Sequence, residues 1–67
     1  MEVTPKHKPG ETVTVTPMGV SERGRLWALK DGELFLIEGG RLGTPTNVLI
    51  LGYSVHRGRV VYYCRAV

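Results

Sequence analysis

Apolar and polar positions alternate along several short segments of this chain, with a period of two residues. The centre of the pattern is the stretch 24–43, in which apolar runs at 26–29 and 34–37 flank the pair Asp31-Gly32. An Asp-Gly pair between two apolar runs is typical of a β-hairpin, because a type I′ turn needs positive φ at both central residues. The sequence therefore predicts a hairpin with a two-residue loop.

The register of this hairpin follows from its turn, since a two-residue loop places Lys30 opposite Glu33. The pairs behind them are Leu29 with Leu34, Ala28 with Phe35, Trp27 with Leu36, and Leu26 with Ile37. Both faces of the hairpin are then apolar, which is typical of strands in the middle of a fold. We expect the face that carries Trp27, Leu29, Leu34 and Leu36 to lie in the core.

Three further segments are predicted to be strands. Residues 11–18 alternate valine with threonine, 46–53 are rich in valine, isoleucine and leucine, and 59–67 alternate apolar with polar residues. No segment has helical periodicity. Five short strands in 67 residues predict an all-β fold, a closed or nearly closed five-stranded antiparallel barrel, because closure removes free sheet edges.

We expect residues 1–10 to form an extended, loosely held tail and residues 11–67 to form the barrel. The predicted core residues are Val13, Val15, Trp27, Leu34, Leu36, Val48, Ile50, Val60 and Cys64.

The composition of the chain limits the chemistry that we expect of it. A chain of 67 residues has a thin core and little room for a deep active site. The single cysteine excludes an intrachain disulfide and favours a reducing, cytoplasmic location, and no apolar run is long enough to span a bilayer. His7, His56 and Cys64 lack the spacing of a zinc site. We therefore expect a non-catalytic protein without metal or cofactor.

Charge is distributed unevenly, although the net charge is only +3, because all six acidic residues lie at or before Glu38. The rest of the chain carries Arg41, Arg57, Arg59 and Arg65. Arg59, Tyr63 and Arg65 share one face of the last predicted strand, and His56 and Arg57 lie in the turn before it. Arginine neutralises phosphate and tyrosine stacks on bases, so this face is typical of a surface for single-stranded or looped RNA. The same pattern is also expected of an amphipathic strand whose outward face is polar only because it contacts water.

A series of short motifs runs through the chain from Gly10 onward. The motifs are Gly10-Glu11 before the alternating valines, Gly24, Trp27-Ala28, Asp31-Gly32, the run 34–37, Gly39-Gly40 and Leu42-Gly43. In order and spacing this series resembles the TRAM domain, a small OB-like β-barrel found within RNA-modifying enzymes and as a stand-alone protein. Leu36 departs from the family where an aromatic residue is common. The resemblance implies a stand-alone module that binds tRNA or other structured RNA.

We therefore expect an RNA-binding module, with an RNA chaperone as one form of that function. Its partners would be RNA and a larger RNA-modifying or RNA-processing protein, and no membrane. The residues expected to bind RNA are Arg23, Arg25, Arg41, His56, Arg57, Arg59, Tyr63 and Arg65. The alternative is an SH3-like module that docks on a protein through exposed apolar residues such as Phe35, Leu49 and Val61.

Overall fold

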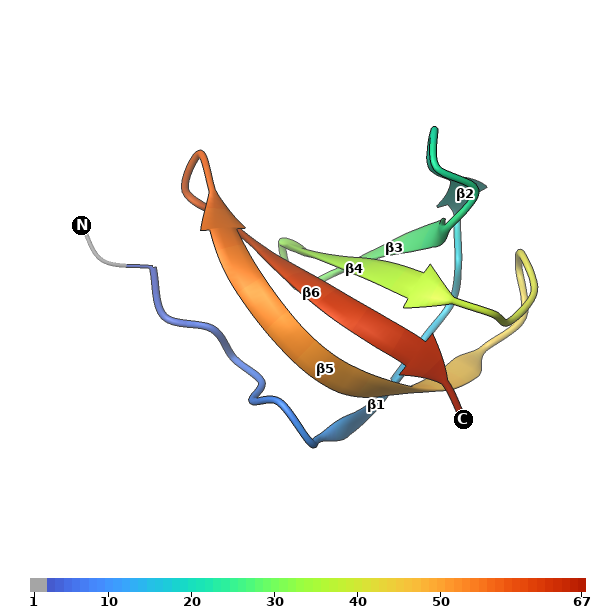
Figure 1. Cartoon of the computed structure of the whole chain (residues 1–67), viewed down its shortest axis with the longest axis horizontal. Helices are drawn as coiled ribbons and strands as arrows, with labels where there is room; N and C mark the ends of the chain where they lie inside the picture. Colours follow the sequence, from blue (N-terminus) through green and yellow to red (C-terminus); the bar gives the residue numbers. More distant parts are fainter. Residues whose placement is uncertain (1–2) are drawn as a thin grey trace.

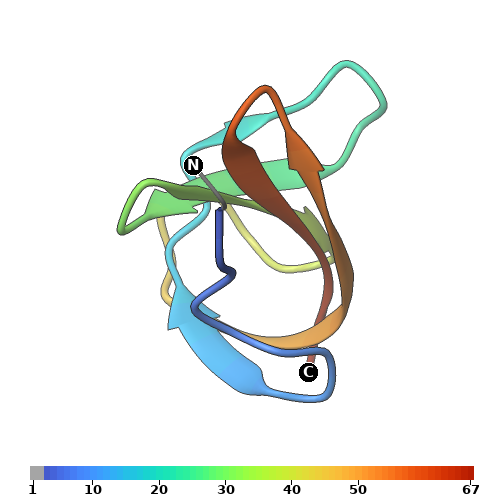
Figure 2. The ribbon, with the colours of Figure 1, turned by 90° about the vertical axis from the view of Figure 1, so that its left-hand side faces the viewer.

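The computed structural model describes residues 3–67, and this part of the chain is all-β without a helix. Its strands are β1 (Thr12–Val15), β2 (Gly19–Val20), β3 (Leu26–Lys30), β4 (Glu33–Glu38), β5 (Thr46–His56) and β6 (Arg59–Ala66). They form one sheet in the order β1-β5-β6-β4-β3-β2 (Figure 1). Figure 2 shows the sheet curled into a half-barrel. The predicted all-β class is confirmed.

The described residues contain six strands, where the sequence predicts five. The additional strand, β2, lies where the sequence predicts the end of one strand and the start of a loop, and it pairs Gly19 with Trp27. A Cβ at Gly19 would lie 2.6 Å from Nε1 of Trp27, so the indole covers β2 only because glycine stands there. A strand of two residues is too short to produce an alternating pattern that a sequence could reveal.

The sheet is mixed, which corrects the prediction of a purely antiparallel barrel. Strands β4 and β6 run parallel, whereas the other neighbouring strands are antiparallel. Strand β1 lies at one end of the sheet and β3 lies next to β2 at the other end, and within residues 3–67 no strand pairing joins β1 to β3. The Lys30 Nζ of β3 instead donates to the Thr14 carbonyl of β1, at 3.1 Å.

The β3–β4 hairpin has the predicted register. Lys30 pairs with Glu33, and the pairing continues without a shift to Leu26 with Ile37. Asp31 and Gly32 have φ values of 52° and 78°, the positive values that a type I′ turn requires. The two turn residues therefore fix the alignment of both strands, as the sequence indicates.

The buried face of this hairpin is the opposite of the predicted one. The buried residues are Ala28, Phe35 and Ile37, each 0% exposed. The residues predicted to be buried on the other face, Trp27, Leu34 and Leu36, are only half-buried. The partner strand explains the difference, because Phe35 lies beside Tyr62 of β6 and the two rings stack with centroids 4.8 Å apart. The inner face of β6 thus selects the face of the hairpin that enters the core.

The other predicted core residues are buried as expected. They are Val13, Val15, Val48, Ile50, Val60 and Cys64. Tyr62 joins them with no exposed surface and forms the centre of the core with Phe35. Because a small domain has few buried side chains, these two rings supply a large share of the buried apolar area.

Strand β5 is the longest strand and connects two parts of the sheet. Its first residues pair with β1, and most of its length pairs with β6. The register with β6 shifts between Ile50 and Gly52, which leaves Leu51 as the extra residue of a bulge. Bulges bend the strand that carries them, and Figure 1 shows β5 as a strongly curved ribbon. This bend gives the sheet its curl.

Residues 3–11, before β1, form no strand but are held against the half-barrel. The backbone N–H of Lys6 donates to Glu33 Oε2 at 3.2 Å, and that of His7 donates to the Tyr62 hydroxyl at 3.0 Å. The Tyr62 hydroxyl in turn donates to Glu33 Oε2 at 2.9 Å. The expectation of a loose arm is therefore wrong for Lys6 and His7. The same hydrogen bonds explain how Glu33, which is 5% exposed, lies in the protein interior.

Candidate functional site

The outer face of β6 carries the residues on which the RNA prediction depends. Exposure alternates along the strand, with Arg59, Tyr63 and Arg65 exposed and Val61 half-buried on the same face. The sequence predicts this face correctly, because the charged residues alternate with apolar ones and leave a single orientation for the strand.

The outer residues of β4 extend this face. The parallel register places Leu34 beside Val61 and Leu36 beside Tyr63. Together these four residues form a half-exposed, mainly apolar strip, here termed the β4–β6 floor. Leu34 and Leu36 are predicted from the sequence to lie in the core, so their place on this outer face is not foreseen. The parallel pairing that brings them here has no local sequence signal.

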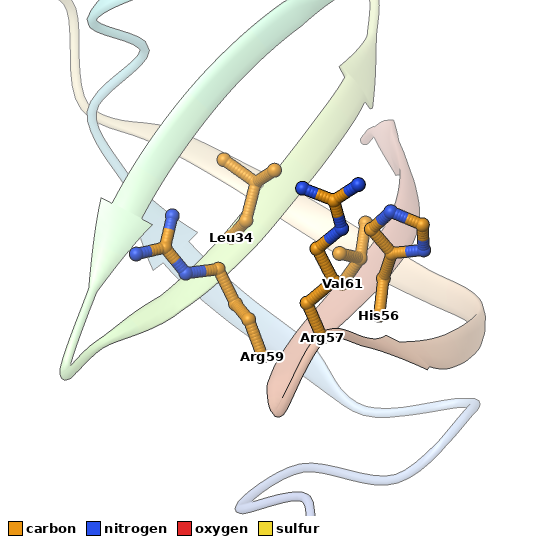
Figure 3. A pocket seen from close by; sticks show the side chains of 5 residues that line it. All are labelled: Leu34, His56, Arg57, Arg59 and Val61. Carbon is orange, nitrogen blue, oxygen red and sulfur yellow. The ribbon is translucent and has the colours of Figure 1, made fainter.

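The first of two open hollows on the floor lies beside the β5–β6 turn and is termed the arginine hollow (Figure 3). Its lining residues are Leu34, His56, Arg57, Arg59 and Val61. Positive φ at Arg57 and Gly58 makes the turn tight, so His56 pairs directly with Arg59. In Figure 3 the guanidinium groups of Arg57 and Arg59 extend toward the side on which Leu34 lies. The hollow thus combines two cations and an imidazole above an apolar base.

The second hollow, termed the tyrosine hollow, lies where the loop between β2 and β3 meets the floor. Its lining residues are Ser21, Glu22, Arg23, Arg25, Leu36 and Tyr63. Hydrogen bonds hold the loop, since Ser21 N–H donates to the Arg25 carbonyl and Arg25 N–H donates to Ser21 Oγ at 3.1 Å. The Gly24 N–H closes the turn on the Ser21 carbonyl at 2.9 Å, with φ of 79° at Gly24. Arg23 and Arg25, which the sequence places only in a loop, therefore lie beside Tyr63.

One side of Tyr63 faces open space. Tyr63 is 39% exposed, and its hydroxyl oxygen lies 3.2 Å from Ser54 Oγ. The residue opposite it on β5 is Gly52, where even an added Cβ would meet no atom within 4 Å. The position opposite Tyr63 on β5 therefore carries no side chain, whereas the tyrosine hollow lies on the other side of Tyr63, toward β4 and the loop between β2 and β3.

Two of the predicted arginines lie outside both hollows. Arg65 is exposed on β6 beside Glu38, and Arg41 is exposed in the loop between β4 and β5. The structure therefore divides the predicted residues into two groups. Those that line a hollow are Arg23, Arg25, His56, Arg57, Arg59 and Tyr63. Arg65 shares its end of the sheet with an acidic side chain, which weakens the local positive potential.

The arginines of both hollows form no ion pair within residues 3–67. The ion pair present in this part of the chain joins His7 Nδ1 and Glu11 Oε2 at 3.0 Å, and this hydrogen bond lowers the pKa of Glu11. It belongs to the segment before β1 and contacts neither hollow. The guanidinium groups are thus available to bind an external anion.

Cys64 is the free cysteine of the described residues, and its side chain is buried. Burial raises the pKa of the Cys64 thiol to about 11, so the group is protonated near neutral pH. Residues 3–67 contain no group of three His, Cys, Asp or Glu side chains that could hold a metal ion. They also contain no helix of the length and apolarity needed to cross a membrane. The outer face offers binding chemistry, with cations and one aromatic ring.

The residues expected to dock on a protein are placed differently from the prediction. Phe35 is 0% exposed and so takes no part in an outer surface, which corrects that expectation, and Leu49 and Val61 are half-buried. The strongly exposed apolar residues near the sheet end are Met18, Val20 and Leu29, at 60%, 56% and 45%. They lie around β2 and β3, apart from the arginine hollow.

No protein-family model matches the chain, and no curated protein matches its sequence. The resemblance to TRAM domains therefore stays a prediction.

Proposed function

We propose that this protein binds unpaired segments of RNA, without catalysis, on the outer face of β4 and β6. The observation that supports this most strongly is the placement of the arginine hollow and the tyrosine hollow on one apolar floor. A row of cations next to an exposed aromatic ring is the combination by which proteins bind single-stranded nucleic acid.

The arginine hollow supplies the contact to phosphate. Arg57 and Arg59 come from one tight turn, so their charges are held close together at a fixed place on the sheet. Guanidinium groups bind phosphate oxygens with charge-assisted hydrogen bonds, often two at a time. The Leu34 and Val61 side chains beneath them exclude water from one side, which strengthens such contacts.

The tyrosine hollow supplies the contact to a base. The Tyr63 ring and Leu36 line this hollow together, so Leu36 continues the apolar surface next to the ring. A base can stack here only when it is not stacked within a duplex, so the site favours loops, bulges and single strands. The proposed ligands are accordingly tRNA or other structured RNAs with unpaired segments, in the cytoplasm. This agrees with the function that the TRAM resemblance implies.

The test is a titration of a labelled single-stranded RNA, followed by fluorescence anisotropy at several salt concentrations. For the wild-type protein we expect affinity to fall with salt, with a log–log slope of about −0.7 per phosphate contacted. The double variant Arg57→Ala/Arg59→Ala should bind more weakly and with a flatter slope. Arg41→Ala/Arg65→Ala is the matched control, because it removes the same charge outside both hollows.

Two results would contradict the proposal. One is the absence of salt-sensitive RNA binding by the wild-type protein at about 50 mM salt. The other is an equal loss in both double variants, which would show that overall charge and not the arginine hollow controls binding. A duplex of the same sequence should bind less tightly than the single strand.

A further inference from the structure

We propose that the tyrosine hollow selects bases that carry an exocyclic amino group, and that Glu22 is the residue that determines this specificity. The inference rests on the proposed RNA-binding function and adds a preference for cytosine over uracil. The proposal starts from the Glu22 carboxylate, which lines a hollow whose other charged residues are cations. Binding of RNA phosphates does not explain why an acidic side chain lies there.

The Glu22 carboxylate repels phosphate and attracts hydrogen-bond donors. An ionised carboxylate is only an acceptor, with two oxygens available. Within residues 3–67, Glu22 forms no ion pair, although Arg23 and Arg25 line the same hollow, so its oxygens are not occupied by these arginines. The donors that RNA offers are the N–H groups of its bases, above all the exocyclic amino groups. A carboxylate that accepts from the N4 amino group of cytosine is a known mode of base recognition.

The loop that carries Glu22 is held in place by its own hydrogen bonds. The bonds between Ser21 and Arg25, and from Gly24 to Ser21, close the turn on both sides of Glu22. The backbone of Glu22 therefore has a defined position at the rim of the hollow. A base stacked on Tyr63 would present its edge to this rim, because stacking places the plane of the base against the ring and its edges outward.

The two hollows lie one step apart along the sheet. The arginine hollow contains the pair Leu34 and Val61, and the tyrosine hollow contains the next outward-facing pair, Leu36 and Tyr63. Two residues along a strand span about 7 Å. Among residues 3–67, no acidic residue lines the arginine hollow, whereas one lines the tyrosine hollow. This difference assigns a phosphate to the first hollow and the adjoining base to the second.

Cytosine and uracil test the proposal most directly, because they are similar in size and stack alike. Where cytosine has the N4 amino donor, uracil has the O4 acceptor, which would face the carboxylate oxygen with like partial charge. We expect the wild-type protein to bind oligo(C) about 10-fold more tightly than oligo(U) of the same length, which is the discrimination that one good contact to a base edge provides.

The experiment measures both affinities for the wild type, for Glu22→Gln and for Glu38→Gln. A glutamine at 22 can donate as well as accept, so the affinity for oligo(U) should rise and the ratio of the two affinities should fall toward 1. Glu38 is exposed on β4 outside both hollows, and its glutamine variant removes the same charge. It should raise both affinities slightly and leave their ratio unchanged.

The possible failures are distinguishable. If the wild-type protein binds neither oligomer in a salt-sensitive way, the proposed function itself is wrong. If it binds both equally, or if Glu22→Gln keeps the preference for oligo(C), RNA binding stands and the role of Glu22 is wrong. An equal change of the ratio in Glu22→Gln and Glu38→Gln would likewise contradict a contact at the hollow.

Discussion

The hydroxyl group of Tyr62 links the segment before β1 to the half-barrel, and its removal tests that link. In Tyr62→Phe the ring keeps its stacking on Phe35, at a centroid distance of 4.8 Å. Two hydrogen bonds disappear, the one donated to Glu33 Oε2 at 2.9 Å and the one accepted from the His7 N–H at 3.0 Å. The change therefore separates the polar network from the packing of the core.

The size of the effect follows from the burial of Glu33. Its Oε1 atom has no hydrogen-bond partner within the described residues, so after the substitution the carboxylate keeps only the bond from the Lys6 N–H. A hydrogen bond to a charged group contributes about 1.5–3 kcal/mol, and an unsatisfied buried group adds to the loss. We expect Tyr62→Phe to lower the free energy of unfolding by about 2–4 kcal/mol. A domain of this size has about 3–10 kcal/mol in total.

The assay is urea denaturation followed by circular dichroism, together with amide hydrogen exchange at Lys6 and His7. Each kcal/mol lost should also lower the Tm by about 4–8 °C. The neighbouring Tyr63→Phe is the matched control, because Tyr63 is exposed and, within residues 3–67, its hydroxyl has a hydrogen bond with Ser54 Oγ alone. It should change the stability by less than about 0.5 kcal/mol.

The reasoning would be refuted by a loss below about 0.5 kcal/mol in Tyr62→Phe. It would also be refuted if the wild-type amides of Lys6 and His7 exchanged as fast as those of an unfolded chain. Either result would show that the segment before β1 is not held by this network.

Two further predictions concern the core. Phe35→Ala should cost about 3–5 kcal/mol in urea denaturation, and Leu36→Ala clearly less because Leu36 is half-buried; the reverse order would contradict the observed buried face. Cys64 should react slowly with a thiol reagent at pH 8 until urea unfolds the protein. Burial raises the pKa of the Cys64 thiol from 9.0 to about 11, so the stability that the protonated thiol contributes should be complete below about pH 9 and be lost as the pH rises to about 11. A free energy of unfolding that does not change between pH 9 and pH 11 would contradict this.

The elements that could be predicted are those whose causes are local. Asp31 and Gly32 define the hairpin, because the need for positive φ is a property of these two positions. The face of β6 is equally local, since Arg59 and Arg65 cannot be buried without partners. In both cases the deciding information lies within a few neighbouring residues.

The buried face of the hairpin could not be predicted, because both of its faces are apolar. Glu33 lies on the same side as Phe35 and so argues against burial of that side. Its partners, Tyr62 and the Lys6 N–H, are 29 and 27 residues away in sequence. No local pattern indicates that these groups meet.

Only part of the candidate site could be predicted, because some of its residues meet through contacts between distant parts of the sequence. The sequence places Arg59 and Tyr63 on one strand, but it does not indicate that the loop of Arg23 and Arg25 reaches Tyr63. It also does not indicate that Arg65 lies apart from them. These relations depend on how β3 and β4 dock on β6, which pairs residues that are distant in the chain.

The parallel pairing of β4 with β6 has a consequence for the order in which the chain folds. The hairpins β3–β4 and β5–β6 need only short loops to close, so each can form quickly from local contacts. Joining them brings Leu34 to Val61 and closes a much longer loop, which makes this step slow. The β4–β6 floor forms at that step, so an intermediate with both hairpins formed would still lack the two hollows. Newly made protein should therefore gain the two hollows, and with them the proposed RNA-binding surface, only at the end of folding.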